Sequence, residues 1–278
     1  MRGLLSWLAR DKRAALSLVW LLGLLALGLA APLIAPYSPT AQSLSDTLLP
    51  PDVHHLLGTD DLGRDVFTRL IYGAPLALYA SVLATAVAVA IGVPLGLMAG
   101  FLGGWVDVVV SRLVDTMLSF PAIILAVAIT GALGTGLVNS MTAVGVVFSP
   151  VLARLVRGQT LVLRGELFVD AARCFGASTS RILLRHVLPN VVQPVLVQVT
   201  LLLAASLLAE ASLSFLGLGV QPPAPSWGAM LARAYGYLEI APEQMYAPGL
   251  AILFSALAFN ALGESLRTAL DPTTRTSR

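Results

Sequence analysis

Residues 75–100 read PLALYASVLATAVAVAIGVPLGLMAG and include no charged side chain. A helix needs about 20 mostly apolar residues to cross the roughly 30 Å of hydrocarbon in a bilayer, so this stretch predicts a membrane-spanning helix. The whole chain shares this character, because 57% of its 278 residues are hydrophobic and 12% are charged. A soluble globular chain typically carries about 25% charged residues. The sequence therefore predicts an all-α integral membrane protein with a single membrane domain.

The same criterion finds five more spans, one before this stretch and four after it, which gives six transmembrane helices. The six predicted spans are residues 14–35, 75–100, 112–134, 137–156, 195–218 and 245–267. Between the third and the fourth, residues 131–136 form a short, weakly polar turn, so a fused or re-entrant element there is an alternative to two simple spans. The first span exceeds the about 7–15 residues of a signal-peptide core, and we expect an uncleaved anchor.

The distribution of arginine and lysine predicts the orientation of these spans. Cytoplasmic loops carry an excess of both residues, and they gather in the tail 1–13, the segment 157–194 and the tail 268–278. The segment 36–74 instead carries five aspartates. We therefore expect both termini and the segment 157–194 in the cytoplasm. We expect 36–74 outside, between a first helix at 14–35 and a core of five spans at 75–267.

Composition and motifs exclude several classes of function. The net charge of +2 and the lack of a dense basic run argue against nucleic acid. The single cysteine, Cys174, allows neither an intramolecular disulfide nor a Cys-rich metal site. A phosphate-binding loop needs a lysine after its glycines, and the only lysine, Lys12, follows Asp11. With no catalytic triad, zinc motif or paired carboxylates, we predict no catalytic residue, no metal site and no cofactor in this chain.

The segment between spans four and five is too long for a simple connection and too polar to span. Residues 165–194 read GELFVDAARCFGASTSRILLRHVLPNVVQP. We expect a first short helix at about 166–175 that ends at Gly176 in the left-handed conformation. Ser178 then caps a second helix, which Pro189 stops. The residues alone leave two interpretations open, an amphipathic hairpin anchored on lipid and a docking element for another protein.

The order of residues in this segment resembles the signature loop of ABC importer permeases, which docks on an ATPase subunit. That loop reads Glu-Ala-Ala, three residues, Gly, nine residues, Ile, any residue, Leu-Pro. Asp170 stands in place of the glutamate and His186 in place of the isoleucine. A histidine before Leu-Pro-Asn is similar to the peptide and nickel branch of the family. The matching residues are Asp170, Ala171, Ala172, Gly176, His186, Leu188, Pro189 and Asn190.

Two other segments are similar to the C-type subunits of dipeptide and oligopeptide permeases, and the resemblance extends over about residues 15–272. One is residues 210–219, followed by Ser226-Trp227-Gly228. The other lies just before span two and includes Gly58, Thr59, Asp60, Asp61, Gly63, Arg64 and Asp65. Its aspartates lack the ligand order of a calcium-binding EF-hand, so we expect a turn and a helix N-cap outside the membrane. His54 and His55 have no third ligand, and we expect an exposed pair.

The resemblance implies an ABC type I importer permease fold in a bacterial inner membrane. It implies a heterodimer with a second, related permease, two ATPase subunits that bind ATP and Mg, and an extracytoplasmic solute-binding protein. The implied cargo is di- or oligopeptide, with nickel or glutathione as alternatives. An ion-coupled secondary carrier is a rival function, but such carriers usually show repeated halves, and no internal repeat is evident. A purely structural membrane anchor is a third alternative for the function.

Glu210 is the one acidic residue well inside a predicted span. A charged side chain in hydrocarbon is costly, which makes it a candidate functional residue. Two roles are open: a structural ion pair or hydrogen bond that holds span five, and contact with solute in the pathway.

Overall fold

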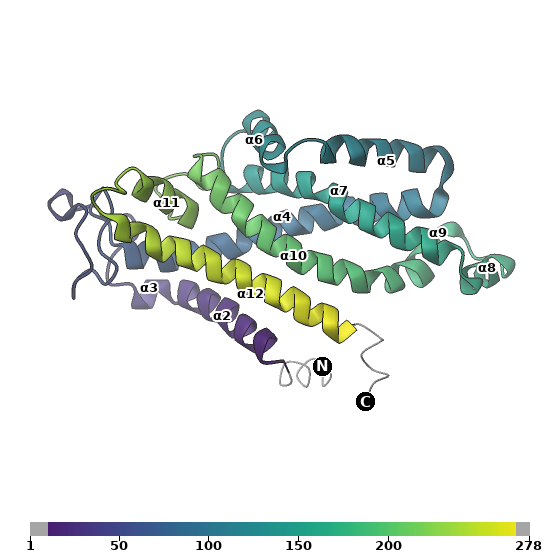
Figure 1. Ribbon diagram of the computed structural model, residues 1–278, viewed down its shortest axis with the longest axis horizontal. Coiled ribbons are helices and arrows are strands. Elements are labelled where there is room, and N and C mark those ends of the chain that lie inside the picture. Colours follow the sequence, from purple (N-terminus) through teal and green to yellow (C-terminus); the bar gives the residue numbers. More distant parts are fainter. Residues whose placement is uncertain (1–10, 271–278) are drawn as a thin grey trace.

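The computed structural model describes residues 11–270, which form a bundle of long helices (Figure 1). The tails 1–13 and 268–278 therefore lie largely outside the described residues. No β-strand occurs between residues 11 and 270. The helices are α2 (Lys12–Leu29), α3 (Ala31–Ile34), α4 (Val66–Leu102), α5 (Gly104–Leu118), α6 (Ala122–Leu133), α7 (Leu137–Arg164), α8 (Leu167–Cys174), α9 (Thr179–Ile182), α10 (Leu188–Phe215), α11 (Trp227–Tyr235) and α12 (Tyr246–Leu270). Short 3-10 helices are η1 (Leu44–Asp46) and η3 (Pro242–Met245), and η2 (Leu183–Val187) is a π-helical turn.

Five of the helical segments in residues 11–270 are long and apolar enough to cross a membrane. They are α2, α4, α7, the continuous segment from α9 through α10, and the segment from η3 through α12. The pair α5 and α6 passes the same test together, which makes six if the pair is one span. The prediction of an all-α membrane protein is confirmed, and the count of six fits with a broken third span.

The third predicted span, 112–134, is not one helix. α5 and α6 meet at an angle of 98° across residues 119–121. Pro121 has no backbone N–H to donate, and a proline disfavours helical geometry in the residue before it, so the helix ends before Phe120. The turn expected at 131–136 is present, because α6 ends at Leu133 and α7 begins at Leu137.

Other helices are longer than predicted. α4 begins at Val66 rather than at residue 75, and α7 continues to Arg164 rather than ending at 156. Pro75 lies inside α4, because neighbouring helices in a membrane bundle stabilise a helix that proline would break in water. Pro189 lies at the start of α10, directly after the π-helical turn η2, and the helical segment Thr179–Phe215 runs through it. The prediction that Pro189 stops a helix was therefore wrong.

α4 and α7 pack with their backbones in close approach. A Cβ atom at Gly96 would lie 2.6 Å from the carbonyl oxygen of Ala153, and comparable clashes arise at Gly92 and Gly100. These three glycines, spaced four apart, line one face of α4. Small residues at this spacing let membrane helices approach closely. The glycines in span two therefore serve packing.

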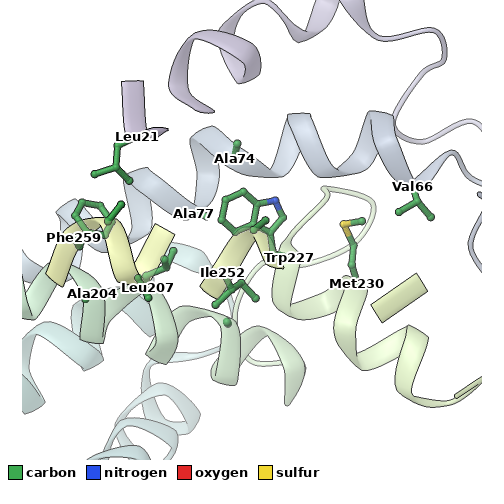
Figure 2. Close-up of a cluster of buried hydrophobic side chains, with 14 residues drawn as sticks. Leu21, Val66, Ala74, Ala77, Ala204, Leu207, Trp227, Met230, Ile252 and Phe259 are labelled. Atoms are coloured by element: carbon green, nitrogen blue, oxygen red, sulfur yellow. The ribbon is translucent and has the colours of Figure 1, made fainter. Parts of the chain in front are cut away.

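The helices are ordered across the bundle, with α2 and α12 on one side and α5 and α6 on the opposite side (Figure 1). α4, α7 and α10 lie between them. Figure 2 shows the cluster where α2, α4, α10, α11 and α12 meet around Trp227. Trp227 is fully buried and its Nε1 donates to the carbonyl oxygen of Leu70 at 2.9 Å. This contact ties the short helix α11 to α4.

Candidate functional site

The segment predicted to be a helical hairpin projects from one end of the bundle, as α8, a turn and α9 (Figure 1). Gly176 has a φ of +73°, as the sequence predicts. The N–H of Gly176 bonds to the carbonyl of Arg173, and the N–H of Ala177 to the carbonyl of Ala172. These two bonds form a Schellman motif, which satisfies the last carbonyls of α8.

The second helix begins as predicted and then continues into the membrane. Ser178 caps α9, because its Oγ accepts from the N–H of Arg181 at 3.4 Å. α9 runs through η2 into α10 without a break, as the continuous segment Thr179–Phe215. The second half of the hairpin is therefore one end of a helix that is long and apolar enough to span a membrane.

The inner face of the hairpin is fixed to the bundle by buried apolar side chains. Val169, Ile182 and Val187 are at most 2% exposed. They belong to a cluster that includes Phe101 of α4 and Val156 of α7. The guanidinium of Arg173 also lies 5.5 Å from the centre of the Phe101 ring. The hairpin is thus a rigid extension of α4, α7 and α10.

The hairpin also carries exposed apolar side chains and exposed arginines. Leu167 at the start of α8 is 84% exposed, and Phe175 at its end is 92% exposed; we call these two residues the hairpin tip. Arg173, Arg181 and Arg185 are exposed nearby in the chain, and Arg173 pairs with Asp170 at 3.1 Å.

The matched residues of the signature loop do not share one face. Ala171 is exposed, whereas Ala172 packs against the bundle's own cluster, so the two alanines cannot together enter a partner's groove. Pro189 and Asn190 are exposed, and His186 and Leu188 are half-buried. The side-chain amide of Asn190 donates to the carbonyl of His186 at 2.7 Å, which reinforces the helix where it leaves the hairpin.

The aspartate-rich segment before α4 folds into tight turns at the other end of the bundle. Asp60 accepts from the N–H groups of Leu62 and Arg64 at 2.9 and 3.0 Å, and from the Nε of Arg64 at 2.7 Å. Gly63 has a φ of +65°, and a Cβ there would lie 1.8 Å from the carbonyl oxygen of Ser43. The turn therefore requires glycine at this position.

The expected N-cap is Asp65, whose carboxylate accepts from the N–H of Thr68 at 2.7 Å. Its other oxygen lies 3.0 Å from the Nδ1 of His55, whose ring stacks on Tyr37. The side chain of His55 is 13% exposed, so the expectation of an exposed histidine pair was wrong for this residue. The pairing joins residues ten apart and is invisible to local sequence patterns.

Further contacts tie the same segment to its neighbours. Thr59 donates its hydroxyl to the carbonyl of Asp46, and Gly58 accepts from the N–H of Val66 at 3.1 Å. Asp61 pairs with Arg233 of α11 at 3.0 Å. In residues 11–270 no group of three or more His, Cys, Asp or Glu side chains is placed to hold a metal ion.

Glu210 lies near the end of α10 and is 2% exposed. Its Oε1 accepts from the hydroxyls of Ser214 at 2.7 Å and of Ser226 at 3.1 Å. Ser226 is the N-cap of α11 and also accepts from the N–H of Ala229. Glu210 thus joins α10 to the start of α11, an arrangement that favours the structural role.

Two ion pairs between α5 and α7 escaped the sequence analysis. Asp107 binds Arg157 through two bonds, one of them 2.8 Å long, and Asp115 lies 2.6 Å from Arg154. The sequence did contain a signal for these pairs, because charged residues are few in this chain. Two acidic residues lie on one helix, Asp107 and Asp115, and two basic residues lie on another, Arg154 and Arg157. α5, which carries both aspartates, was predicted only in part, because the expected span 112–134 begins within this helix and runs through the bend at Pro121.

Residues 92–276 match the model of a family described as the inner membrane component of binding-protein-dependent transport systems. The chain belongs to this family. Residues 5–51 also match a model described as the N-terminal transmembrane domain of oligopeptide transport permease C. The family membership confirms the resemblance drawn from the sequence, and it makes the chain a multi-pass membrane component of a transport system.

Curated relatives are similar along nearly the whole chain. A protein of Alkalihalophilus pseudofirmus called dipeptide transport system permease protein DppC is 40% identical over 265 residues, covering 95% of this chain and 87% of the relative. The glutathione transport system permease protein GsiD of Shigella flexneri serotype 5b is 46% identical over 264 residues, with the same coverage.

A solved structure shares the fold. A chain of the MetNI methionine ABC transporter in an inward-facing conformation superposes with a TM-score of 0.61 at 21% identity, over 73% of this chain and 97% of that chain. The likeness confirms the type of fold expected for an ABC importer permease.

Proposed function

We propose that this chain is the transmembrane permease subunit of an ATP-driven importer that carries small peptides across a bacterial inner membrane. Relatives named for dipeptide and for glutathione transport support this solute class. Glutathione is itself a tripeptide, so both names indicate small zwitterionic peptides. In this proposal the chain has no ATPase site, and separate ATPase subunits bind ATP and Mg.

The observation that carries the proposal is the rigid hairpin with its exposed apolar tip. Leu167 and Phe175 are more than four-fifths exposed, and burial in a partner's groove would stabilise the contact by about 1.5–3 kcal/mol for each such side chain. The surrounding arginines offer charge-assisted hydrogen bonds to the same partner. A separate ATPase subunit that binds this tip fits both features.

The mechanism follows from the continuity of α9 and α10. Closure of two ATPases around ATP would displace the hairpin, and the displacement would tilt α10 together with α4 and α7, because all three pack against it. A ligand shifts such an equilibrium only by its differential affinity for the two states. ATP would favour the outward-open bundle, and release of its hydrolysis products the inward-open one.

The assembly in this proposal contains a second, related permease, two ATPases and an extracytoplasmic solute-binding protein. In Figure 1 the start of α2 and the end of α12 are the ends of these helices nearer the hairpin, and α11 lies toward the opposite end of the bundle. This arrangement supports a topology with the hairpin and both termini in the cytoplasm. The turns at residues 58–65 and α11 would then face the solute-binding protein.

The test is uptake by proteoliposomes that contain the full assembly. We expect radiolabelled dialanine or glutathione to accumulate only with the solute-binding protein and hydrolysable ATP. Uptake driven by an ion gradient without ATP would instead identify a secondary carrier. Uptake of nickel in place of peptide would contradict the solute class, and purification that recovers no ATPase would favour a structural anchor.

A further inference from the structure

The two ion pairs between α5 and α7 differ in how firmly they are held. Asp107 and Arg157 are joined by two bonds, Ser111 donates a third to Asp107, and the two charged side chains are 22% and 34% exposed. Asp115 and Arg154 share one contact of 2.6 Å and are 59% and 58% exposed. The first pair is a closed, fixed contact, whereas the second is open to the surroundings.

The open pair borders a groove of about 230 Å³ between α5 and α7. One wall comes from Ser111, Val114 and Asp115 of α5, and the other from Arg154 and Arg157 of α7. Arg154 is ten residues from the end of α7, which corresponds to roughly 15 Å at the helical rise. A charged side chain turned toward lipid inside a span costs at least about 2.5 kcal/mol, so this groove faces water or protein.

The opposite side of the bundle has the surface expected of a lipid-facing wall. The middle stretches of α2 and α12 expose apolar side chains there, among them Leu16, Val19, Leu253 and Leu257. Figure 1 shows α2 and α12 on one side and α5 on the other. The open pair thus lies on the side of the bundle away from this apolar stretch of α2 and α12.

We propose that the groove between α5 and α7 is part of the wall of an aqueous solute pathway, in which Arg154 binds the carboxylate and Asp115 the ammonium group of a passing peptide. This inference rests on the proposed function, because it assumes a zwitterionic peptide as cargo. Arginine holds a carboxylate in a planar, two-point contact. The carboxylate of the peptide therefore replaces Asp115 as the partner of Arg154, and its ammonium group replaces Arg154 as the partner of Asp115.

The exchange leaves no charge unpaired at either stage. In the empty pathway Arg154 and Asp115 neutralise each other, and in the occupied pathway each is neutralised by one end of the peptide. The net binding energy is small because one set of contacts replaces another. Weak binding suits conduction, which needs a site that a solute enters and also leaves. Arg157, fixed on Asp107, keeps α5 and α7 in register beside the exchanging pair.

The first test measures transport kinetics in the full assembly, with dialanine and glutathione as probes. We expect Arg154→Gln and Asp115→Asn each to raise the KM for ATP-driven uptake about tenfold, with the amount of assembled complex preserved. Arg267→Gln is the matched control, because Arg267 is a 72% exposed arginine near a carboxylate on α12. Equal KM values for Arg154→Gln and Arg267→Gln would overturn the proposal.

The second test asks what covers the groove. In a Cys174→Ser background, Ser111→Cys places a thiol in the groove wall. We expect a membrane-impermeant maleimide to label it in the assembled complex, and saturating dialanine with binding protein and ATP to slow the labelling. A thiol that reacts in the isolated chain and not in the assembly would show the second permease seated on this face, which overturns the pathway role. A wild-type assembly that imports neither probe would refute the proposed function itself.

Discussion

At Gly176 the backbone adopts a φ of +73°, and no atom lies within 4 Å of a Cβ built there. The position thus has room for a side chain but not the backbone conformation for one. Placing an L-residue in the left-handed region costs roughly 1–2 kcal/mol. For Gly176→Val we expect ATP-driven uptake to fall at least fivefold in proteoliposomes, with normal amounts of protein in the membrane, because the hairpin no longer holds one shape.

The matched control is Gly165→Val in the same segment. Gly165 has an ordinary φ of −88°, and a Cβ there would meet only the carbonyl of Val162, at 3.6 Å. This variant should transport as the wild type does. Equal losses in both variants would show that bulk in this segment, and not the turn at Gly176, limits transport.

A second prediction for a single residue concerns Glu210. Removal of its carboxylate leaves two buried hydroxyls without their acceptor, and an unsatisfied buried polar group costs about 1–3 kcal/mol. Glu210→Gln keeps one acceptor oxygen for both hydroxyls, so we expect uptake and the level of protein in the membrane, measured by immunoblot, to stay near those of the wild type. Glu210→Leu should reduce the protein level. Lowered uptake by Glu210→Gln at an unchanged protein level would contradict a purely structural role.

Local residue patterns predicted part of the hairpin and of the turns near α4. The left-handed Gly176 and the Ser178 cap follow from rules that span a few residues, and the structure contains both. The inward position of Ala172 and the pairing of His55 with Asp65 depend on how distant segments meet. The sequence contains no local signal for such contacts.

At the scale of elements, the crossing of α4 and α7 sets the spacing of the bundle. A Cβ at Gly96 would lie 2.6 Å from the carbonyl oxygen of Ala153 and 2.7 Å from the Cβ of Val156, and both atoms are held by α7. We expect Gly96→Leu to separate the helices and to lower the Tm of the detergent-solubilised protein, since overpacking typically costs about 1–3 kcal/mol or more.

Gly23 of α2 is the control for this substitution, because no atom lies within 4 Å of a Cβ built there. Gly23→Leu should leave the Tm within a degree or two of the wild type. A Gly96→Leu protein as stable as Gly23→Leu would contradict the close approach of α4 and α7.

Hydrophobic length predicted where helices lie better than where they end. The run 75–100 lies inside α4, but the helix extends back to Val66, because the Asp65 cap and not the loss of hydrophobicity sets its start. Between α5 and α6 the apolar pattern continues through the break. There the geometry is set by Pro121, whose effect a hydrophobicity criterion does not register.

At the scale of the whole molecule, one end of the bundle carries the hairpin and the other carries the turns at residues 58–65 and α11 (Figure 1). α10 is continuous with the hairpin at one end and contacts α11 through Glu210 and Ser226 at the other. This continuity gives a direct mechanical connection between the two ends, as a permease driven from the cytoplasm requires.

The most direct test of that connection is ATP-driven peptide uptake by the full assembly with the hairpin tip altered. Leu167→Asp with Phe175→Asp changes two side chains that are 84% and 92% exposed, so folding should be preserved. Val53→Asp, at a residue 87% exposed elsewhere, is the control. The account predicts that the tip variant loses both co-purifying ATPase and uptake while the control keeps both. Undiminished uptake by the tip variant would contradict it.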